Sequence, residues 1–432
     1  MSVAQKDGIR TAGRISYTDL YKRWEEGNWR AYEIDFSQDR AGWEALTDIQ
    51  RKSALWVYSM FFYGEDSVTD NLSPYIDAAP KEEQKYFLAS QQVDETRHAV
   101  FFHRFFSEVI GAGGGDLAST LAFTQPQLGW GYRNVFERLD RMSADLRRDR
   151  SLANFARAIA MYHLVVEATL AQPGQHFIED YFVKSGTMPG FSAGMRNVSR
   201  DEQRHIGFGV KVLSELFAES EECKQAVAEL LAEVMPYSLA VFTPPDWDLE
   251  YTRCWGFELE DIYAFGMRSV LTKWRVIGYP LEDMPGVFPV DIELEPEEIA
   301  RRQIKLMRAG VLGEPNGRPD SSPEVQELFF DVIARSARTD AINGKALTIQ
   351  WRFEDADPWH LRIDNGSSHA APGELPDADI TVETSWADWI GVTTHGGDPR
   401  RAMLRRRLRP HGRIRDLWRM SKVFPGRPSR LG

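Results

Sequence analysis

Two nearly identical pentapeptides on well-separated parts of the chain constrain its fold most. Asp94-Glu95-Thr96-Arg97-His98 and Asp201-Glu202-Gln203-Arg204-His205 each hold a glutamate and a histidine three residues apart. On an α-helix, residues three apart lie about 60° from each other around the axis, so each glutamate shares a face with its histidine. A carboxylate and an imidazole directed at one point can bind iron or manganese. One such pair is common on solvated helices, but two copies on different helices predict a metal site.

A site for two metal ions in a helix bundle also needs one carboxylate from each of two further helices. Glu65 lies in the apolar run SMFFYGEDSV and Glu167 in MYHLVVEATLA. A charge in such a run is costly to bury unless it is paired or binds a metal. The alternative is that both form ion pairs with Arg97 and Arg204 in a plain bundle, but buried ion pairs alone stabilise poorly. We therefore predict six metal ligands: Glu65, Glu95, His98, Glu167, Glu202 and His205.

Four nearby side chains leave other roles open. Asp66 could replace the glutamate before it, although it faces about 100° away on the same helix. His163 lies one turn before Glu167 and is either a ligand or a donor to one. Asp94 and Asp201 cannot share the direction of the glutamates that follow them. We expect each of these aspartates to hydrogen-bond a ligand histidine on a facing helix, which fixes the tautomer of the imidazole.

The spacing of apolar residues predicts a mainly α protein with a small second domain. The apolar spacing of residues from about 40 to 280 predicts long helices. Four such helices suggest a bundle. The segment GVLGEPNGRPDSSPE, rich in proline and glycine, then marks a linker. Beyond it, apolar and polar residues alternate in ALTIQWRF, as in a half-buried strand. The predicted domains are a helical domain at residues 1–309, a linker at 310–323 and an α+β domain at 324–432.

Composition and charge exclude several classes of protein. Hydrophobic residues make up 43% of the chain, enough for a large core, and the two cysteines, Cys223 and Cys254, cannot build a disulfide framework. We find no signal peptide and no apolar run of about 18 residues, so we expect a cytoplasmic protein. The net charge is −12, yet the segment from Asp398 onward holds eleven Arg and one Lys against two Asp, or +10. Such a tail could touch phosphates, a membrane surface or an acidic partner, or it could form a solvated basic face that balances an acidic neighbour. No recognition motif predicts nucleic-acid binding.

The order of the candidate ligands resembles that of the ribonucleotide reductase small subunit. Glu, Glu-x-x-His, Glu and Glu-x-x-His follow one another with gaps of 30, 72 and 35 residues. The resemblance covers about residues 20 to 285, includes NWRAYEIDFSQD, and implies a ferritin-like helical bundle. It also implies an electron-relay chain of Trp29, Asp201 and His98. Two features depart from the radical-storing subunits: Phe102 stands where they carry a tyrosine, and the chain continues into a folded domain instead of their flexible tail.

The closer resemblance is to the ligand-binding oxidases of the same superfamily. The segment GFELEDIYAFGMRSV also resembles that group. In those proteins a manganese–iron site activates O2 and joins a valine to a tyrosine through an ether bond; the matching residues here are Val68 and Tyr162. Tyr162 precedes Glu167 by five residues, a spacing that a π-type turn would bring onto one face. The resemblance further implies that Glu95 and Glu202 bridge the metals, that a long-chain fatty acid binds beside them, and that the protein is a homodimer.

The C-terminal domain resembles the sterol carrier protein type-two lipid-binding domain, from about Val325 to Phe424. The match runs through ALTIQWRF, HLRIDNG, ADITVETSWADWIGVTTHGGDP and a closing helix. Pro410 interrupts the usual last strand in RRRLRPHGR, which leaves that strand in question. The resemblance implies a lipid tunnel lined by residues such as Trp351, Phe353 and Trp389.

These patterns together predict an O2-activating oxidase with a dinuclear metal site that acts on a hydrophobic, lipid-like molecule. The ligand types suit Mn/Fe and Fe/Fe alike. The helix surfaces around Phe61, Phe101 and Val166 would hold the acyl chain, and the second domain would bind or deliver the molecule. Two alternatives stay open: a ribonucleotide reductase radical subunit with an appended domain, and a non-catalytic lipid-binding protein with a structural metal site. Nothing in the sequence predicts the physiological substrate.

Overall fold

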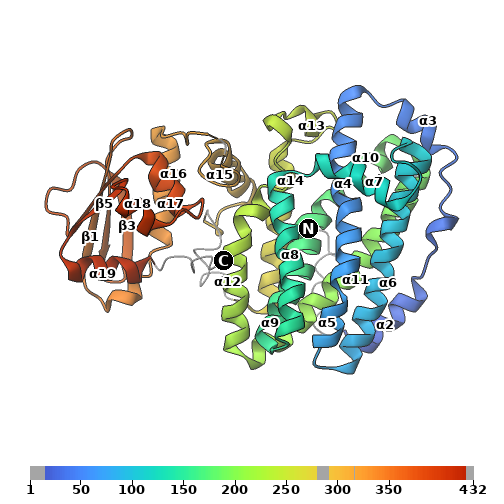
Figure 1. Cartoon of the computed structure of the whole chain (residues 1–432), viewed down its shortest axis with the longest axis horizontal. Helices are drawn as coiled ribbons and strands as arrows, with labels where there is room; N and C mark the ends of the chain where they lie inside the picture. The colour runs from blue at the N-terminus through green and yellow to red at the C-terminus, as the bar shows by residue number, and fades with distance from the viewer. Residues whose placement is uncertain (1–14, 280–290, 316, 425–432) are drawn as a thin grey trace. The chain divides into compact units, whose positions relative to one another are not determined.

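The computed structural model describes residues 15–279, 291–315 and 317–424, and the chain forms two compact units, Met1–Leu281 and Glu282–Gly432 (Figure 1). The described elements of the first unit are all helical, whereas the second combines a five-stranded sheet with helices. This confirms the predicted fold class, a mainly α protein with a ferritin-like helical bundle followed by a small α+β domain.

Four long helical stretches carry the chemistry-bearing motifs of the first unit. They are α4 (Asp48–Asn71), α6 (Glu82–Phe105), the continuous run of α9 (Leu152–Ile159), η4 (Ala160–Ala171) and α10 (Gln172–Ser185), and α11 (Pro189–Glu219). The other helical elements around them are α2 (Tyr17–Glu26), η1 (Ala31–Glu33), α3 (Asp39–Glu44), α5 (Ser73–Ala78), η2 (Phe106–Ile110), α7 (Leu117–Thr124), η3 (Gln125–Gln127), α8 (Trp130–Arg148), α12 (Glu221–Leu239), η5 (Pro245–Trp247), α13 (Glu250–Arg253) and α14 (Leu259–Ile277).

Local sequence signals set the ends of these helices. Thr47 caps α4, where its hydroxyl accepts from the Gln50 amide and the Gln50 side chain accepts in return from the Thr47 amide. The helix that begins with α6 ends at Gly111, the first residue of the segment GAGGG, which takes the left-handed conformation at φ 74° and so stops this helix. The stretch from Trp43 to Ile76, which the apolar spacing predicts as one helix, is by contrast divided among α3, α4 and α5. Pro74 accounts for the second break, because it fits only the first turn of a new helix.

The segment that carries Glu167 is a π-helix. In η4 the backbone bonds close across five residues instead of four, so Tyr162 and Glu167 come onto neighbouring turns of one face. This is the kind of π-type turn that is needed to bring two residues five positions apart onto one face. Gly209 on α11 lets η4 approach closely, because a Cβ at that position would lie 2.3 Å from the Cβ of His163.

An aromatic cluster joins α6 to α11. Phe101, Phe102 and Phe105 are fully buried, and the rings of Phe105 and Phe191 lie 4.2 Å apart. A Cβ on Gly194 would lie 2.1 Å from the Phe101 ring, so the missing side chain makes room for it. Close packing of this kind holds both Glu-x-x-His motifs in a fixed relation, because the cluster follows directly after the first motif and precedes the second.

The second unit is built on a sheet in the order β3-β2-β1-β4-β5, in which β1 and β4 are parallel and the other neighbours antiparallel. Its elements are α15 (Pro296–Arg308), α16 (Pro323–Arg335), η7 (Thr339–Ile342), β1 (Leu347–Phe353), β2 (Trp359–Asp364), β3 (Ser367–Pro372), β4 (Ile380–Thr384), α17 (Trp386–Thr393), α18 (Pro399–Leu404), β5 (Leu408–Gly412) and α19 (Ile414–Val423). Helix α16 packs on the sheet, where Phe330 stacks on Trp359 with ring centroids 4.6 Å apart.

The last strand forms despite Pro410. In β5 this proline lies opposite Val382 of β4, and β5 is the edge strand of the sheet. An edge strand tolerates proline because its outer backbone groups pair with no neighbour.

The predicted linker at 310–323 is folded into the second unit. Val311 is fully buried, the Asp320 amide donates to the Ala309 carbonyl at 2.8 Å, and Lys305 of α15 forms an ion pair with Glu324 of α16. Helix α15 therefore belongs with the second unit in the structure, and the division between the compact units falls at 281/282.

Lys273 of α14 is a lysine whose burial should make the stability of the helical unit depend on pH. The Lys273 ammonium contacts Ser269 and the Gln172 side-chain oxygen but has no carboxylate partner among the described residues. Burial lowers the pKa of Lys273 to about 7. Between about pH 7 and pH 10 the unfolded lysine keeps its proton while the folded one loses it, so stability rises with pH.

We expect Lys273→Met to flatten this rise and to increase the free energy of unfolding at pH 7 by about 2 kcal/mol. The measurement is the thermal midpoint of the helical unit at pH 7 and pH 9. Lys22→Met, at an exposed lysine of α2, is the matched control and should leave the pH profile unchanged. Identical profiles for Lys273→Met and wild type would contradict the prediction.

Candidate metal centre

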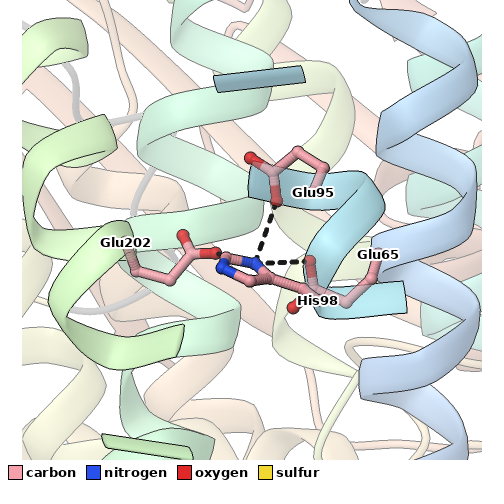
Figure 2. Close-up of side chains that lie close together, drawn as sticks. All are labelled: Glu65, Glu95, His98 and Glu202. Carbon is pink, nitrogen blue, oxygen red and sulfur yellow. Dashed lines mark hydrogen bonds and ion pairs between the residues drawn. The ribbon is translucent and has the colours of Figure 1, made fainter. Parts of the chain in front are cut away.

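The structure brings all six predicted ligands together at the centre of the helical unit. Glu65 comes from α4, Glu95 and His98 from α6, Glu167 from η4, and Glu202 and His205 from α11. All six side chains are buried. Their donor atoms form two overlapping sets, each within 4.8 Å: Glu65, Glu95, His98 and Glu202, and then Glu95, Glu167, Glu202 and His205. Figure 2 shows the first set, with Glu65 and Glu95 directed at the His98 ring.

Both histidines turn the same ring nitrogen toward the carboxylates. Nδ1 of His98 lies 3.2 Å from Glu65, 3.3 Å from Glu95 and 3.6 Å from Glu202. Nδ1 of His205 lies 3.2 Å from Glu95, 3.4 Å from Glu167 and 3.8 Å from Glu202. Glu95 and Glu202 face both rings, which makes them the two carboxylates able to serve two metal ions at once.

The opposite nitrogen of each ring contacts the aspartate of the other motif. His98 Nε2 lies 3.3 Å from Asp201, and His205 Nε2 lies 3.1 Å from Asp94. Such a contact holds the ring with Nδ1 free for a metal. Burial disfavours the charge of Asp201, but the hydrogen bond from His98 and the charges of His98 and Arg204 lower its pKa well below the usual range.

The arginines of the two motifs pair with these aspartates and not with the ligand glutamates. Arg204 contacts Asp94 and donates to Asp201 at 3.0 Å, and Arg97 donates to Asp94 at 3.0 Å. The alternative in which Glu65 and Glu167 are neutralised by these arginines therefore does not describe the structure.

Buried polar atoms without partners indicate that the donor set fits metal ions. Within the described part of the chain, Glu167 Oε2, Glu202 Oε2 and His205 Nδ1 are buried and make no hydrogen bond. A buried acceptor left unsatisfied costs about 1–3 kcal/mol. Carboxylate oxygens and imidazole nitrogens are the ligands that iron and manganese accept, so two ions would satisfy these atoms.

The pKa values describe the same cluster without metal. Burial raises the pKa of Glu65 to about 8, and burial together with the neighbouring carboxylates raises the pKa values of Glu167 and Glu202. Burial opposes the charge of both imidazoles, yet the surrounding carboxylates raise their pKa values well above the usual range. Protons thus balance the negative charge of the cluster wherever metal ions do not.

A cavity of about 60 Å³ adjoins the cluster. All four ligand glutamates line it, together with Val68, Tyr162 and apolar side chains that include Phe61 and Val166. Tyr162 donates a hydrogen bond of 2.6 Å to Glu95, so its phenol oxygen lies beside a ligand shared by both sets. Of the residues expected to line an acyl channel, Phe101 is absent from this cavity because it packs in the aromatic cluster.

Two of the open alternatives lie outside the donor sets. Asp66 is half-buried and belongs to neither set. His163 contacts the side-chain oxygen of Gln91 at 3.0 Å, and Gln91 in turn donates to Glu167 at 2.8 Å. Burial lowers the pKa of His163 to about 3, so this ring is neutral.

Two residues of the site were not predicted from the sequence. Gln91 precedes Glu95 by four residues, a helical spacing that would have indicated the shared face. Trp24 donates to Asp94 at 2.9 Å, just as Trp29 donates to Asp201 at 2.8 Å. Each ligand histidine therefore contacts an aspartate, which in turn accepts a hydrogen bond from an indole. No local pattern links Trp24 to Asp94, because the two lie on α2 and α6, which meet only in the folded chain.

Residues 15–240, just over half of the chain, match the family model described as "Ribonucleotide reductase, small chain". The fold and the paired carboxylate–histidine sets thus define the class, and the chain belongs to the ribonucleotide reductase small-chain family.

Among solved structures, the chain is similar to several R2-like ligand-binding oxidases. One variant with an anaerobically reconstituted Mn/Fe cofactor is 24% identical, with a TM-score of 0.53 over 62% of this chain and 95% of that chain. A second such variant is 25% identical, with a TM-score of 0.51 over 62% and 94%. The enzyme from Sulfolobus acidocaldarius is 23% identical, with a TM-score of 0.50 over 66% and 93%. At this level of identity the likeness establishes the shared fold.

The C-terminal part matches a different family from the one expected. Residues 325–425 match the model described as "Alkyl sulfatase C-terminal", which replaces the sterol carrier protein type-two assignment. The alternating strands and closing helix that suggested the assignment describe the layout of the domain, which is too general to separate the two families. Among the described residues, none of the helices combines the length and apolar character needed to cross a bilayer.

Proposed function

We propose that this chain is an O2-activating oxidase with a manganese–iron pair, held by Glu65, Glu95, His98, Glu167, Glu202 and His205. One observation carries the proposal: two donor sets share Glu95 and Glu202 beside a mostly apolar cavity that also holds a valine and a tyrosine. The similar oxidases whose descriptions name a Mn/Fe cofactor support the choice of metals, and the same ligand types would accept Fe/Fe. When bound, such a pair supplies electrons to O2 and the oxidising power to remove hydrogen from carbon.

The protein side chains would orient and protect that chemistry. Glu95 and Glu202 would bridge the metals, since each faces both histidines. The hydrogen bond from Tyr162 to Glu95 holds the phenol at the cavity wall, and burial, followed by the charge of Glu95, raises the pKa of Tyr162 well above its usual value. The phenol thus keeps its proton until it is oxidised. The apolar lining excludes water, which limits side reactions of the oxidised site.

We further propose that the site joins Tyr162 to Val68 through an ether bond. One O–H bond and one C–H bond would be replaced by one C–O bond, with release of two protons and two electrons that O2 accepts. Both residues line the cavity beside the ligand glutamates, which supports the assignment.

Mass spectrometry tests this step directly. Metal-free protein loaded anaerobically with Mn(II) and Fe(II) and then exposed to O2 should lose the mass of two hydrogens, and the peptides of Val68 and Tyr162 should become joined. Tyr162→Phe should abolish the loss. Tyr75→Phe is the matched control, because Tyr75 is buried against the Tyr162 ring but does not line the cavity. Oxygen uptake without a mass change would refute the cross-link and favour oxidation of an external molecule.

The hydrophobic ligand is proposed to lie along two neighbouring cavities. A second cavity, of about 80 Å³ and almost wholly apolar, shares Val57 and Phe242 with the one at the metal centre. A long-chain fatty acid would need both, and therefore a shift of these two side chains. By the sequence prediction, the second unit would bind the same kind of molecule. The indole N–H groups of Trp351 and Trp389 are buried there without hydrogen-bond partners and could donate to its polar group.

An electron relay is proposed through Trp29, Asp201 and His98. Its support is the 2.8 Å hydrogen bond from the Trp29 indole to Asp201 and the stacking of that indole on His98, with ring centroids 6.1 Å apart. A radical-storing reductase subunit is disfavoured because Phe102, where those subunits carry tyrosine, is a phenyl ring packed in the aromatic cluster. We also propose a homodimer, on the family resemblance, and a cytoplasmic location, which the two unpaired cysteines suit.

A further inference from the structure

The outward face of the last helix, α19, combines exposed apolar side chains with basic ones. Ile414 and Trp418 are one turn apart and are 87% and 60% exposed. Ile414 is the most exposed large apolar side chain of the described residues. The same combination occurs before β5, where Leu404 is 85% exposed and is followed by Arg405 and Arg406. Large apolar side chains are kept in water at a cost, so an exposed pair on one helix face indicates a contact surface.

Several cations in and around α19 can meet an anionic partner, although Arg415 and Arg419 pair with Asp416. The one acid of the helix, Asp416, is buried and accepts from Arg419 at 3.0 Å. The Lys422 ammonium lies 3.7 Å from the centre of the Trp418 ring, so charge and apolar surface adjoin. Within 15–279, 291–315 and 317–424, several cations of this segment have no acidic partner: Arg400, Arg405, Arg406, Arg413 and Lys422.

We propose that α19 docks the second unit on an anionic lipid surface, with Ile414 and Trp418 inserted among the headgroups and the surrounding cations on the phosphates. A short helix with apolar residues on one face and basic residues beside them is the pattern of interfacial binding. The phosphates of a nucleic acid offer no apolar surface to an isoleucine such as Ile414, whereas a lipid layer does. This favours lipid over nucleic acid. The charge is also uneven along the chain, because the segment from Asp398 onward carries +10 and the rest carries −12 − 10 = −22.

Vesicle flotation of the full chain tests this surface. We expect binding to phosphatidylcholine vesicles that contain roughly one third phosphatidylglycerol, no binding to phosphatidylcholine alone, and release at high salt. Replacing both Ile414 and Trp418 by serine should weaken binding about tenfold or more. The pair Arg413→Gln and Lys422→Gln should weaken it about tenfold at low salt.

The controls separate this surface from the metal chemistry and from folding. Tyr86→Ser changes a side chain of α6 that is 60% exposed, equal to Trp418, and should leave binding unchanged. Metal-free protein should bind as well as loaded protein, so failure of the oxidase proposal would not affect the result. The inference is overturned if anionic vesicles are not bound, if the Ile414 and Trp418 replacements bind as well as wild type, or if a DNA duplex competes fully with the vesicles.

Discussion

Glu95→Gln is expected to lower the metal content of the reconstituted protein from about two ions per chain to below one, whereas Glu65→Gln and Glu167→Gln should each leave about one. The reason is that Glu95 belongs to both donor sets, while Glu65 serves only the set around His98 and Glu167 only the set around His205. Glutamine keeps the shape of the side chain but loses the charge that the metals need. Metal analysis of anaerobically loaded, desalted protein gives the stoichiometry.

Asp66→Asn provides the control for this series. It removes a carboxylate next to Glu65 in sequence that belongs to neither donor set, so two ions should remain. Circular dichroism should show unchanged helix content for each variant. Equal metal loss in Glu65→Gln and Glu95→Gln would contradict the shared role of Glu95. Loss of metal in Asp66→Asn would show that the ligand set is wrongly assigned.

Loading with Mn(II) and Fe(II) is expected to raise the thermal midpoint of the helical unit by roughly 5–10 °C when free metal is about 100 times its Kd. At one fixed concentration of free metal, the gain should be larger at pH 8 than at pH 6. In metal-free protein the imidazoles of His98 and His205 have raised pKa values, and that of Glu65 is about 8, so protons occupy these groups at pH 6. A metal must displace those protons, which weakens its binding as the pH falls.

Thermal melts with and without metal at both pH values measure this effect. Calorimetric titration in buffers of different ionisation enthalpy should show proton release that decreases from pH 6 to pH 8. His205→Gln removes one of the groups that bind both proton and metal. The competition between protons and metals should therefore be weaker in this variant, which serves as the control. An equal midpoint shift at the two pH values would show that protons and metals do not compete for the cluster.

Much of the fold and of the donor set could be predicted because the signals are local. The spacing of Glu95 and His98 places both on one helix face wherever that helix forms. Glu65 and Glu167 stand out because each is a single charge in an apolar run, and burial of the run follows from its composition. Gly111 marks a helix end through backbone geometry, which the residue carries with it, whereas the helix break at Pro74 was not predicted. The π-helix that carries Glu167 is suggested by the sequence only as the turn that would bring Tyr162 and Glu167 onto one face, and the structure contains it.

Other features depend on which helices become neighbours. The sequence marks Asp94 as a partner for a histidine on a facing helix, but that this histidine is His205, and that Trp24 donates to the same carboxylate, is decided by the packing of α2, α6 and α11. Phe101 is apolar and close to a ligand, as a channel residue would be. It packs in the aromatic cluster instead, because Gly194 has no side chain and leaves room for the ring.

The sequence by itself determined the chemical types of the ligands, the faces on which they lie and the family to which the chain belongs. Tertiary structure alone decided which carboxylates face both histidines, how charge around the site is balanced, and where the compact units divide. The physical reason is range: helix periodicity and backbone preferences act over a few residues, whereas the hydrogen bond from Trp24 to Asp94 spans 70 residues and the ion pair of Arg204 with Asp94 spans 110. Contacts of that range exist only once the helices have packed.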